Sequence, residues 1–315
     1  MPEQELPAPV AEIVAAIRDD TIGGAADMAR LTAQALDALA KEEDGQDFRQ
    51  QLDNSVVALI EVTPSIMPVV RVLHLVVAAA ETHPENPQQH VSQAAQDFVK
   101  WLENALAEVA AIGADMIRDG ERIFLYSMSS TVYRMIEAAL ARGKSVSLIT
   151  TESRPGNEGL TSLQRLCPQG VDVTIGIDAA MVQLIRDCTA VYVGSDTVTS
   201  AGECLAKVGC YPTALAARRF GLPFYVAGDT SKLDPATIRG VPIKIREMPA
   251  SDVVPGELPS HGFVRNPVFE LIPADLITAY VTEVGILHPG SVYSLMASIP
   301  WSDRVGDLVA ANNRR

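Results

Sequence analysis

Hydrophobic and polar positions follow two different periods along this chain, one before Gly120 and one after it. Before Gly120, apolar residues recur every three or four positions, as in "EIVAAIRDD", "AADMARLTAQALDALAKEE" and "VSQAAQDFVKWLENALAEVAAIGADMI". This spacing places the apolar residues on one face of an amphipathic helix. Pro64 and Pro68 interrupt another apolar stretch, so two helical segments are expected to meet there. The pattern therefore predicts that the first part of the chain is helical.

After Gly120 the apolar runs become short and rich in β-forming residues, with helical stretches between several of them. The runs are "RIFLYS", "SVSLIT", "VDVTIGI", "AVYVGS" and "PFYVAG". Strands that alternate with helices predict βαβ units and a parallel sheet, and right-handed crossovers make that sheet doubly wound. We therefore predict an α/β fold, with a helical N-terminal domain over residues 1–118. A Rossmann-like, mainly parallel doubly wound sheet domain is expected to follow over residues 119–315, with ligands at the carboxyl ends of its strands.

Composition narrows the classes of function. Of 315 residues, 48% are hydrophobic and 20% charged, which is typical of a folded globular protein. The net charge is -14 and no stretch is densely basic, so nucleic-acid binding is not expected. The acidic start "MPEQELPAPV" does not resemble a signal peptide, and no apolar run reaches the roughly 20 residues that span a bilayer. We expect a cytoplasmic protein with no membrane contact.

Cysteine and histidine positions give no sign of a metal site. The four cysteines form no CxxC pair, and the five histidines are scattered along the chain. Reduced, buried thiols are the expected state of the cysteines. We expect neither a metal nor another cofactor.

Polar residues follow the first predicted strand in "YSMSSTVYRM". Ser127, Ser129 and Ser130 stand where this strand gives way to a helix. Hydroxyls and free amides at a helix N-terminus can bind a phosphate. Serine is also a preferred N-cap residue, and on this loop alone the pattern favours capping.

Two further loops carry charged residues after predicted strands. In "TTESRPGNEG", Arg154 can grip a phosphate or carboxylate with two hydrogen bonds, or form a surface pair with Glu152. Asp178 is expected to cap the helix that begins at Ala179.

Asp196 raises the sharpest question, because it follows the buried run "AVYV" directly after Gly194 and Ser195. Desolvation there would raise the pKa of its carboxyl group, whereas backbone amides or Lys207 would lower it. Such a carboxylate can act as a general acid or base. It can equally hold a turn by accepting hydrogen bonds from local amides. The residues alone leave both interpretations open.

Several segments together resemble one protein family. They are "TTESRPGNEG", "VYVGSDTVTSAG", "LAKVGCYPTALAARRFGLPFYVAGDTSKLD" and "NPVFELIPADLITAYVTEVGILHP". The chain resembles the alpha, beta and delta subunits of translation initiation factor two-B and the related aldose-1-phosphate isomerases. Those isomerases act on methylthioribose 1-phosphate and ribose 1,5-bisphosphate. The resemblance implies a helical domain, a Rossmann-like domain, and dimers built through the latter.

The resemblance also implies roles for individual residues. Asp196, in "GSD", matches the acidic residue of the family's "GAD" motif, which acts in catalysis together with a cysteine. Gly24 and Ala25 match the end of the family's "RGA" loop, Arg154 its "E-[ST]-R-P" motif and Lys207 its "NKIGT" motif. Together with Ser129, from the loop after the first predicted strand, these are the expected substrate- or phosphate-binding residues.

Other positions depart from the family pattern. Ser127 replaces the catalytic cysteine, Gly23 an arginine, and Ala206 an asparagine. A serine hydroxyl is not ionised at neutral pH without a strong base, so the residue set is only half that of an isomerase. Cys204 or Cys210 could replace the lost nucleophile, although small packing residues are the expected alternative.

These features favour a sugar-phosphate-binding protein, with Asp196 and Ser127 as its catalytic candidates. It would be an aldose–ketose phosphate isomerase with an altered substrate, and would take a phosphorylated sugar or nucleotide as its ligand. A homodimer or higher homo-oligomer is expected. The alternative is a non-catalytic regulatory subunit of a translation initiation complex that exchanges guanine nucleotides.

Overall fold

The computed structural model describes residues 6–19, 22–42 and 47–314. Its contacts divide the chain into two compact units. One, which we call the helical unit, comprises residues 1–105, 231–244 and 293–315. The other, the sheet unit, comprises residues 106–230 and 245–292. The sequence-based division after residue 118 remains a prediction about domains.

The helical unit is built from amphipathic helices whose apolar faces pack together. Helix α1 contacts α2, α2 contacts α4, and α3 contacts α11. Pro64 lies between α3 and α4, and Pro68 lies in the first turn of α4, so two helices meet there as predicted. The helices of this unit are α1 (Ala8–Arg18), α2 (Ala25–Glu42), α3 (Phe48–Val62), α4 (Met67–Thr82), the first part of α5 (Pro87–Met116), α10 (Val292–Met296) and α11 (Asp303–Asn313).

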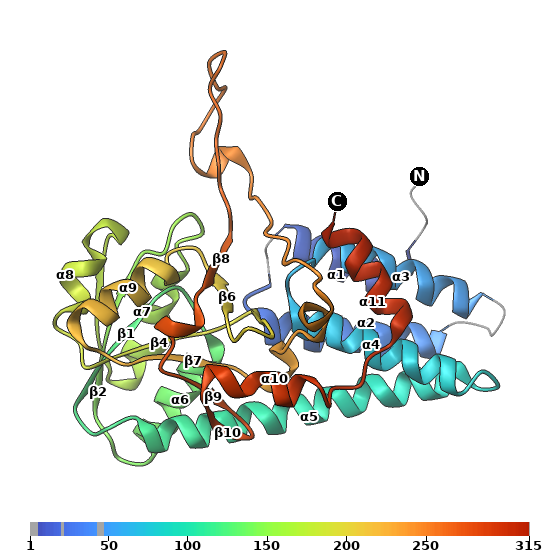
Figure 1. Ribbon diagram of the computed structural model, residues 1–315, viewed down its shortest axis with the longest axis horizontal. Coiled ribbons are helices and arrows are strands. Elements are labelled where there is room, and N and C mark those ends of the chain that lie inside the picture. Colours follow the sequence, from blue (N-terminus) through green and yellow to red (C-terminus); the bar gives the residue numbers. More distant parts are fainter. Residues whose placement is uncertain (1–5, 20–21, 43–46, 315) are drawn as a thin grey trace. The chain divides into compact units, whose positions relative to one another are not determined.

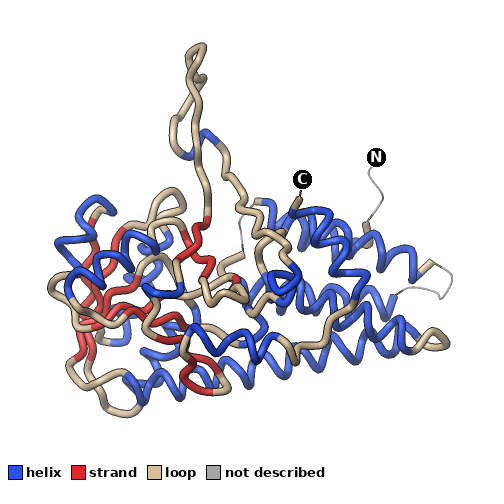
Figure 2. Tube along the Cα trace, in the orientation of Figure 1, coloured by secondary structure: helices blue, strands red, loops and turns tan. Residues whose placement is uncertain are grey.

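The sheet unit has a seven-stranded sheet in the order β10-β9-β7-β4-β1-β2-β3 (Figures 1 and 2). All neighbours are parallel except β9 and β10. The fold-class prediction is therefore confirmed. The strands are β1 (Glu121–Leu125), β2 (Val146–Thr151), β3 (Asp172–Gly176), β4 (Ala190–Val193), β7 (Phe224–Ala227), β9 (Ala279–Thr282) and β10 (Gly285–Leu287).

Helices cover the parallel sheet. The end of α5 and helix α6 share an apolar core with β1 and β2, which includes Ile117, Val132 and Leu148. Helices α8 and α9 contact each other, α8 contacts β2, and α9 contacts β4 and β7. The helices of this unit are α6 (Ser130–Ala141), α7 (Thr161–Leu166), α8 (Met181–Ile185) and α9 (Cys210–Phe220).

A small antiparallel sheet adds to this unit in the order β5-β6-β8. Its strands are β5 (Thr197–Val198), β6 (Cys204–Lys207) and β8 (Phe269–Ile272). Before β8, residues 245–268 form a projecting segment, drawn in orange in Figure 1, that we call the arm. Glu247 closes the base of the arm by accepting hydrogen bonds from Arg265 Nε (2.7 Å) and the Asn266 amide (2.5 Å).

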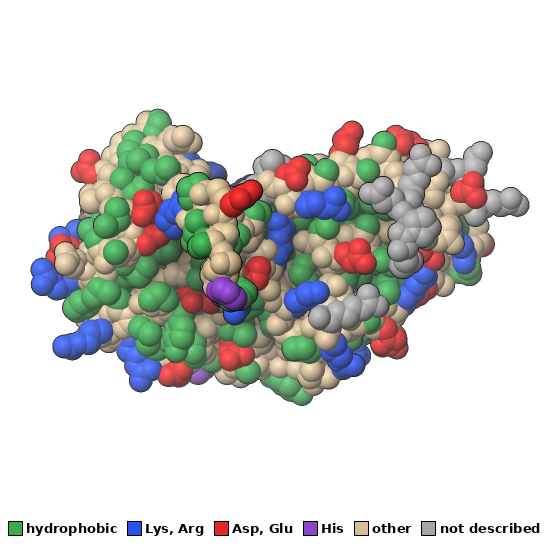
Figure 3. Space-filling model, turned by 90° about the horizontal axis from the view of Figure 1, so that it is seen from above, with side chains coloured by type: hydrophobic (Ala, Val, Ile, Leu, Met, Phe, Trp, Pro, Cys, Tyr) green, Lys and Arg blue, Asp and Glu red, His purple; other side chains and the backbone are tan. Residues whose placement is uncertain are grey.

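Charged side chains of both signs are mixed on the face shown in Figure 3, where the basic residues form no continuous patch. Within the part of the chain that the structure describes, no helix has the length and apolar character needed to cross a membrane.

Candidate functional site

Strands β1 and β4 are neighbours in the sheet, but the chain leaves them in opposite directions. From β1 it continues to β2 and β3 on one side, and from β4 to β7 and β9 on the other. Ligands of open α/β sheets bind at the carboxyl ends of strands where the order reverses in this way. The loops after β1 and β4, which carry Ser127, Ser129 and Asp196, therefore lie at the position where such folds bind ligands.

Gly194 brings these two loops into direct contact. A Cβ atom added to Gly194 would lie 2.8 Å from Ser129 Oγ and 3.0 Å from Ser129 Cβ. Only a residue without a side chain allows the backbone after β4 to come this close to the loop after β1. The sequence-predicted residues Ser129 and Asp196 are thereby held on adjoining loops.

Ser127 and Ser129 shape the turn from β1 into α6. Ser127 is buried and has a left-handed backbone with φ of 64°, and its amide donates to Ser153 Oγ at 2.8 Å. Ser129 is the N-cap of α6, where its hydroxyl accepts a hydrogen bond from the Val132 amide at 3.3 Å. The capping interpretation of this loop is therefore confirmed, whereas a phosphate contact remains a prediction.

Asp196 stands at the beginning of a β-hairpin. Its amide donates to the Leu205 carbonyl at 2.9 Å, next to the pairing of β5 with β6. Its carboxylate is near the buried Cys210, because its negative charge contributes to the raised pKa of that thiol. Lys207 influences the same thiol with the opposite sign. Asp196 and Lys207 thus both lie in the surroundings of the Cys210 side chain.

The buried thiols are poor candidates for the missing nucleophile. Burial raises the pKa of Cys210 well above its usual value, and the negative charges of Glu270 and Asp196 raise it further. Cys204 is also fully buried, and its Sγ lies 3.6 Å from the Leu205 carbonyl oxygen. A buried thiol with a raised pKa is not a reactive nucleophile, so Cys210 fits the packing role. Cys204 fits the same role because it is fully buried.

The ammonium group of Lys207 is paired within the chain. It forms an ion pair and hydrogen bond with Glu158 Oε1, and the two side chains are only 14% and 22% exposed. The other carboxylate oxygen, Glu158 Oε2, is buried and accepts no hydrogen bond from any described residue. A phosphate at Lys207 would have to displace Glu158. The sequence did not single out Glu158, although it lies in the quoted loop "TTESRPGNEG".

Asp178 holds the loop that carries Arg154. Its two carboxylate oxygens accept hydrogen bonds from the Ser153 amide (2.9 Å) and the Arg154 amide (2.7 Å). The expectation that Asp178 caps the helix beginning at Ala179 is therefore wrong, because its oxygens are used by a neighbouring loop. The Arg154 guanidinium is exposed and donates to the Asp252 carbonyl in the arm at 2.6 Å, rather than pairing with Glu152.

Tyr126 and Glu270 also lie in the surroundings of Cys210. A Cβ at Gly209 would lie 2.1 Å from the Tyr126 hydroxyl oxygen, so the backbone and the phenol are in close contact. Burial raises the pKa of Tyr126 far above its usual value, and the charges of Asp178, Glu158 and Glu270 add to this. Tyr126 is therefore a neutral phenol among acidic groups. Glu270 Oε1 accepts from the Gly209 amide (2.6 Å) and the Tyr211 amide (2.8 Å) at the start of α9.

Gly24 and Ala25 belong to the helical unit. Gly24 has φ of 90° and its carbonyl accepts the Met28 amide at 3.1 Å, and the buried Ala25 begins α2. Their predicted part in ligand binding remains a prediction.

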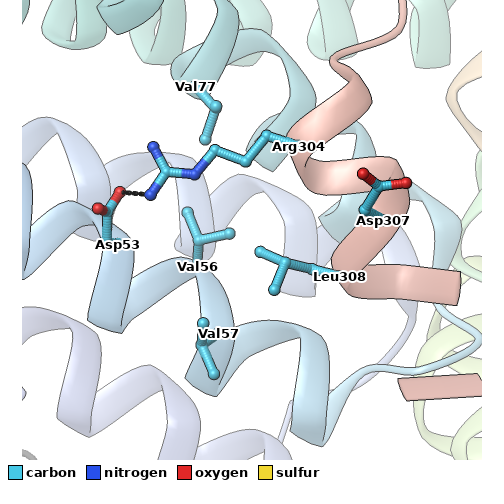
Figure 4. A pocket seen from close by; sticks show the side chains of 7 residues that line it. All are labelled: Asp53, Val56, Val57, Val77, Arg304, Asp307 and Leu308. Atoms are coloured by element: carbon cyan, nitrogen blue, oxygen red, sulfur yellow. Dashed lines mark ion pairs between the residues drawn. The ribbon is translucent and has the colours of Figure 1, made fainter. Parts of the chain in front are cut away.

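The helical unit also contains a cavity of about 330 Å³ between α3, α4 and α11 (Figure 4). Arg304 reaches from α11 to Asp53, with Nη2 2.5 Å from Oδ1, and valine side chains line the same cavity. None of the sequence-predicted site residues lines it.

Comparison with known proteins gives a consistent result. The model of the family described as "Initiation factor 2 subunit family" matches residues 21–289. The ribose 1,5-bisphosphate isomerase of Archaeoglobus fulgidus is 32% identical over 285 residues, which cover 90% of this chain and 91% of that protein. A putative translation initiation factor eIF-2B subunit 2-like protein of Pyrococcus furiosus is 31% identical over 285 residues, covering 90% of this chain and 98% of that protein.

A solved structure supports the same grouping. The translation initiation factor eIF-2B of Pyrococcus horikoshii OT3 is 29% identical, with a TM-score of 0.76. The similarity covers 90% of this chain and 98% of that chain.

Proposed function

The chain belongs to the initiation factor 2 subunit family, and we propose that it binds a phosphorylated sugar where β1 and β4 diverge and isomerises an aldose phosphate to a ketose phosphate. Relatives named ribose 1,5-bisphosphate isomerase support a place among sugar-phosphate isomerases. The altered residue set favours a substrate other than theirs.

One observation carries the proposal, which is the direct contact between the loops after β1 and β4. Gly194 lies against Ser129 at the point where the strand order reverses. Asp196 follows in the same loop, so a carboxylate is held where folds of this kind bind ligands.

Three side chains of the sheet unit fit roles in such a reaction. An aldose–ketose conversion moves a proton or hydride between the first two sugar carbons, and Asp196 can serve as the acid–base group. Tyr126 remains a neutral phenol and can donate a hydrogen bond to a sugar oxygen. Lys207 can bind a phosphate once its ion pair with Glu158 is released.

The test is conversion of ribose 1-phosphate or ribose 1,5-bisphosphate by the full chain, followed by ¹³C and ³¹P NMR. We expect a ketose phosphate product. Replacing Asp196 by Asn should lower turnover by about 100-fold or more, because acid–base groups contribute about 10²–10⁴ in rate.

A matched control is Asp172→Asn, which makes the same change on the exposed residue that begins β3, at the opposite end of the parallel strands. It should leave turnover unchanged. Equal turnover in Asp196→Asn and the unaltered chain would contradict the proposed role.

A second function is favoured by a specific observation, the serine at position 127. Its hydroxyl replaces a thiol, and Cys210, a possible substitute, is buried with a pKa raised well above its usual value. We infer as the alternative a non-catalytic regulatory subunit of a translation initiation complex for guanine-nucleotide exchange. It predicts binding of a phosphorylated sugar or nucleotide without any product in the NMR assay.

We further propose that the chain acts in the cytoplasm as a homodimer or higher homo-oligomer. Light scattering on the purified chain tests this assembly. An isomerase should assemble alone, whereas a regulatory subunit should need other chains.

A further inference from the structure

A short loop joins the end of α4 to the start of α5 in the helical unit (Figure 1). Three side chains of metal-binding type meet at this loop. They are His83, Glu85 and His90, and one possible ligand atom of each lies within 4.8 Å of the others. His83 Nδ1 is 3.5 Å from Glu85 Oε1, and the two imidazole rings stack with centroids 3.6 Å apart. The scattered histidines of the sequence did not predict this grouping.

The backbone that carries these side chains is held in place from several directions. Arg49 Nη2 on α3 donates to the Pro84 carbonyl at 2.8 Å. The Asn86 amide donates to the His83 carbonyl at 3.2 Å, and Pro87 is buried at the first position of α5. Since proline fixes its own φ, the backbone of this loop has limited freedom.

We propose that His83, Glu85 and His90 form a binding site for a divalent transition-metal ion of the Zn²⁺ type. Two imidazoles and one carboxylate are a common ligand set for Zn²⁺, at about 2.0–2.2 Å from the metal. Tetrahedral geometry at those lengths requires ligand atoms about 3.3 Å apart, close to the 3.5 Å between His83 and Glu85. Water would fill the fourth position.

Binding requires a small rearrangement of side chains. The rings are nearly parallel, with 12° between their planes, so they must tilt before both nitrogen lone pairs point at one ion. The side chains of His83 and Glu85 are 42% and 61% exposed, so they can rotate and the ion can enter from solvent. The bound ion would then tie the end of α4 to the first turn of α5.

Calorimetric titration of the full chain with ZnCl₂ at pH 7.5 tests the site. The exposed Cys167 is first replaced by Ser, because a free thiol also binds zinc. We expect one ion per chain, and a melting temperature that rises by about 2–4 °C at saturating zinc. Replacing His90 by Gln should weaken binding tenfold or more and abolish the rise. MgCl₂ should produce neither effect, because Mg²⁺ prefers oxygen ligands.

A matched control is His261→Gln, which removes an exposed histidine from the arm and should leave binding unchanged. Glu85→Gln provides a second variant, expected to weaken binding as well, should His90→Gln perturb folding. Zinc bound with equal affinity by the unaltered chain, His90→Gln and Glu85→Gln would overturn the site, as would the absence of binding to the unaltered chain.

Discussion

The loops at the carboxyl edge of the parallel sheet fall into two pairs that are built differently. The loops after β1 and β4 meet through small residues, Gly194 and Ser129, and their contact is steric. The loops after β2 and β3 meet through charge, because Asp178 accepts two amides of the loop after β2. In that same loop Glu158 pairs with Lys207 of β6.

This difference separates the loops that support the edge of the sheet from the loops of the proposed ligand site. Asp178 already accepts two amides of the loop after β2, so these two loops support the edge without a ligand. The loops after β1 and β4 instead position a carboxylate by close approach of the backbone. A ligand is therefore expected to gain most of its binding free energy where β1 and β4 diverge. To contact the loops after β2 and β3, it would have to displace a group of the chain that is already bound there.

The largest effect on stability is expected from Gly159→Ala, which disrupts the loop after β2. A Cβ at this position would lie 1.8 Å from the Thr151 carbonyl oxygen, a backbone atom that no rotamer change can move. Displacing the backbone should lower the free energy of unfolding by about 3 kcal/mol or more. Urea denaturation followed by circular dichroism measures this loss.

Its control is Gly290→Ala, where the nearest atom to an added Cβ is the His288 Nδ1 at 3.3 Å. That variant should stay within about 1 kcal/mol of the unaltered chain. Equal stability of the two variants would show that the loop after β2 is not a rigid support.

An intermediate effect on stability is expected from Glu158→Gln. This change releases Lys207 from its ion pair and so tests the difference between the two pairs of loops. Removing one partner of a largely buried ion pair should cost about 1–3 kcal/mol of stability. The same change should tighten binding of ribose 1-phosphate, because the ammonium no longer has a competing carboxylate. Calorimetry measures the affinity, and weaker binding would instead make Glu158 a direct ligand contact. Glu152→Gln, in the same loop, serves as the matched control.

The smallest change in stability is expected from Gly194→Ala, which separates the loops after β1 and β4. The added methyl group meets the short side chain of Ser129, which can shift slightly, so the loss should be about 1 kcal/mol. Ligand affinity should nevertheless fall by about tenfold. This corresponds to a loss of about 1.4 kcal/mol of binding free energy when the two loops are misplaced. Unchanged affinity would move the proposed site away from these loops.

Much of the fold could be predicted from local patterns. Each predicted run of β-forming residues from "RIFLYS" to "PFYVAG" contains a strand of the parallel sheet, because buried parallel strands are short and apolar throughout. The position of Asp196 directly after β4 followed from the same pattern. The helix boundary near Pro64 and Pro68 was also predictable, since proline cannot continue a helix.

The partners of the polar residues could not be predicted in this way. Glu158 and Lys207 are 49 positions apart, and the Glu270 acceptor of the Gly209 amide is 61 positions away. Periodicity reports which face of an element is buried, but not which distant loop provides a charge. Asp178 shows the same limit, because local capping rules favour its own helix while the three-dimensional fold supplies two other amides.

The internal ion pair has a consequence for ligand selection. Glu158 is a ligand tethered to the same chain as Lys207, so its effective concentration near the ammonium is in the millimolar range or above. A simple anion in solution must exceed that concentration to occupy Lys207, whereas a ligand with several further contacts need not. Under the proposed function, we therefore expect Glu158 to disfavour inorganic phosphate relative to larger phosphorylated molecules.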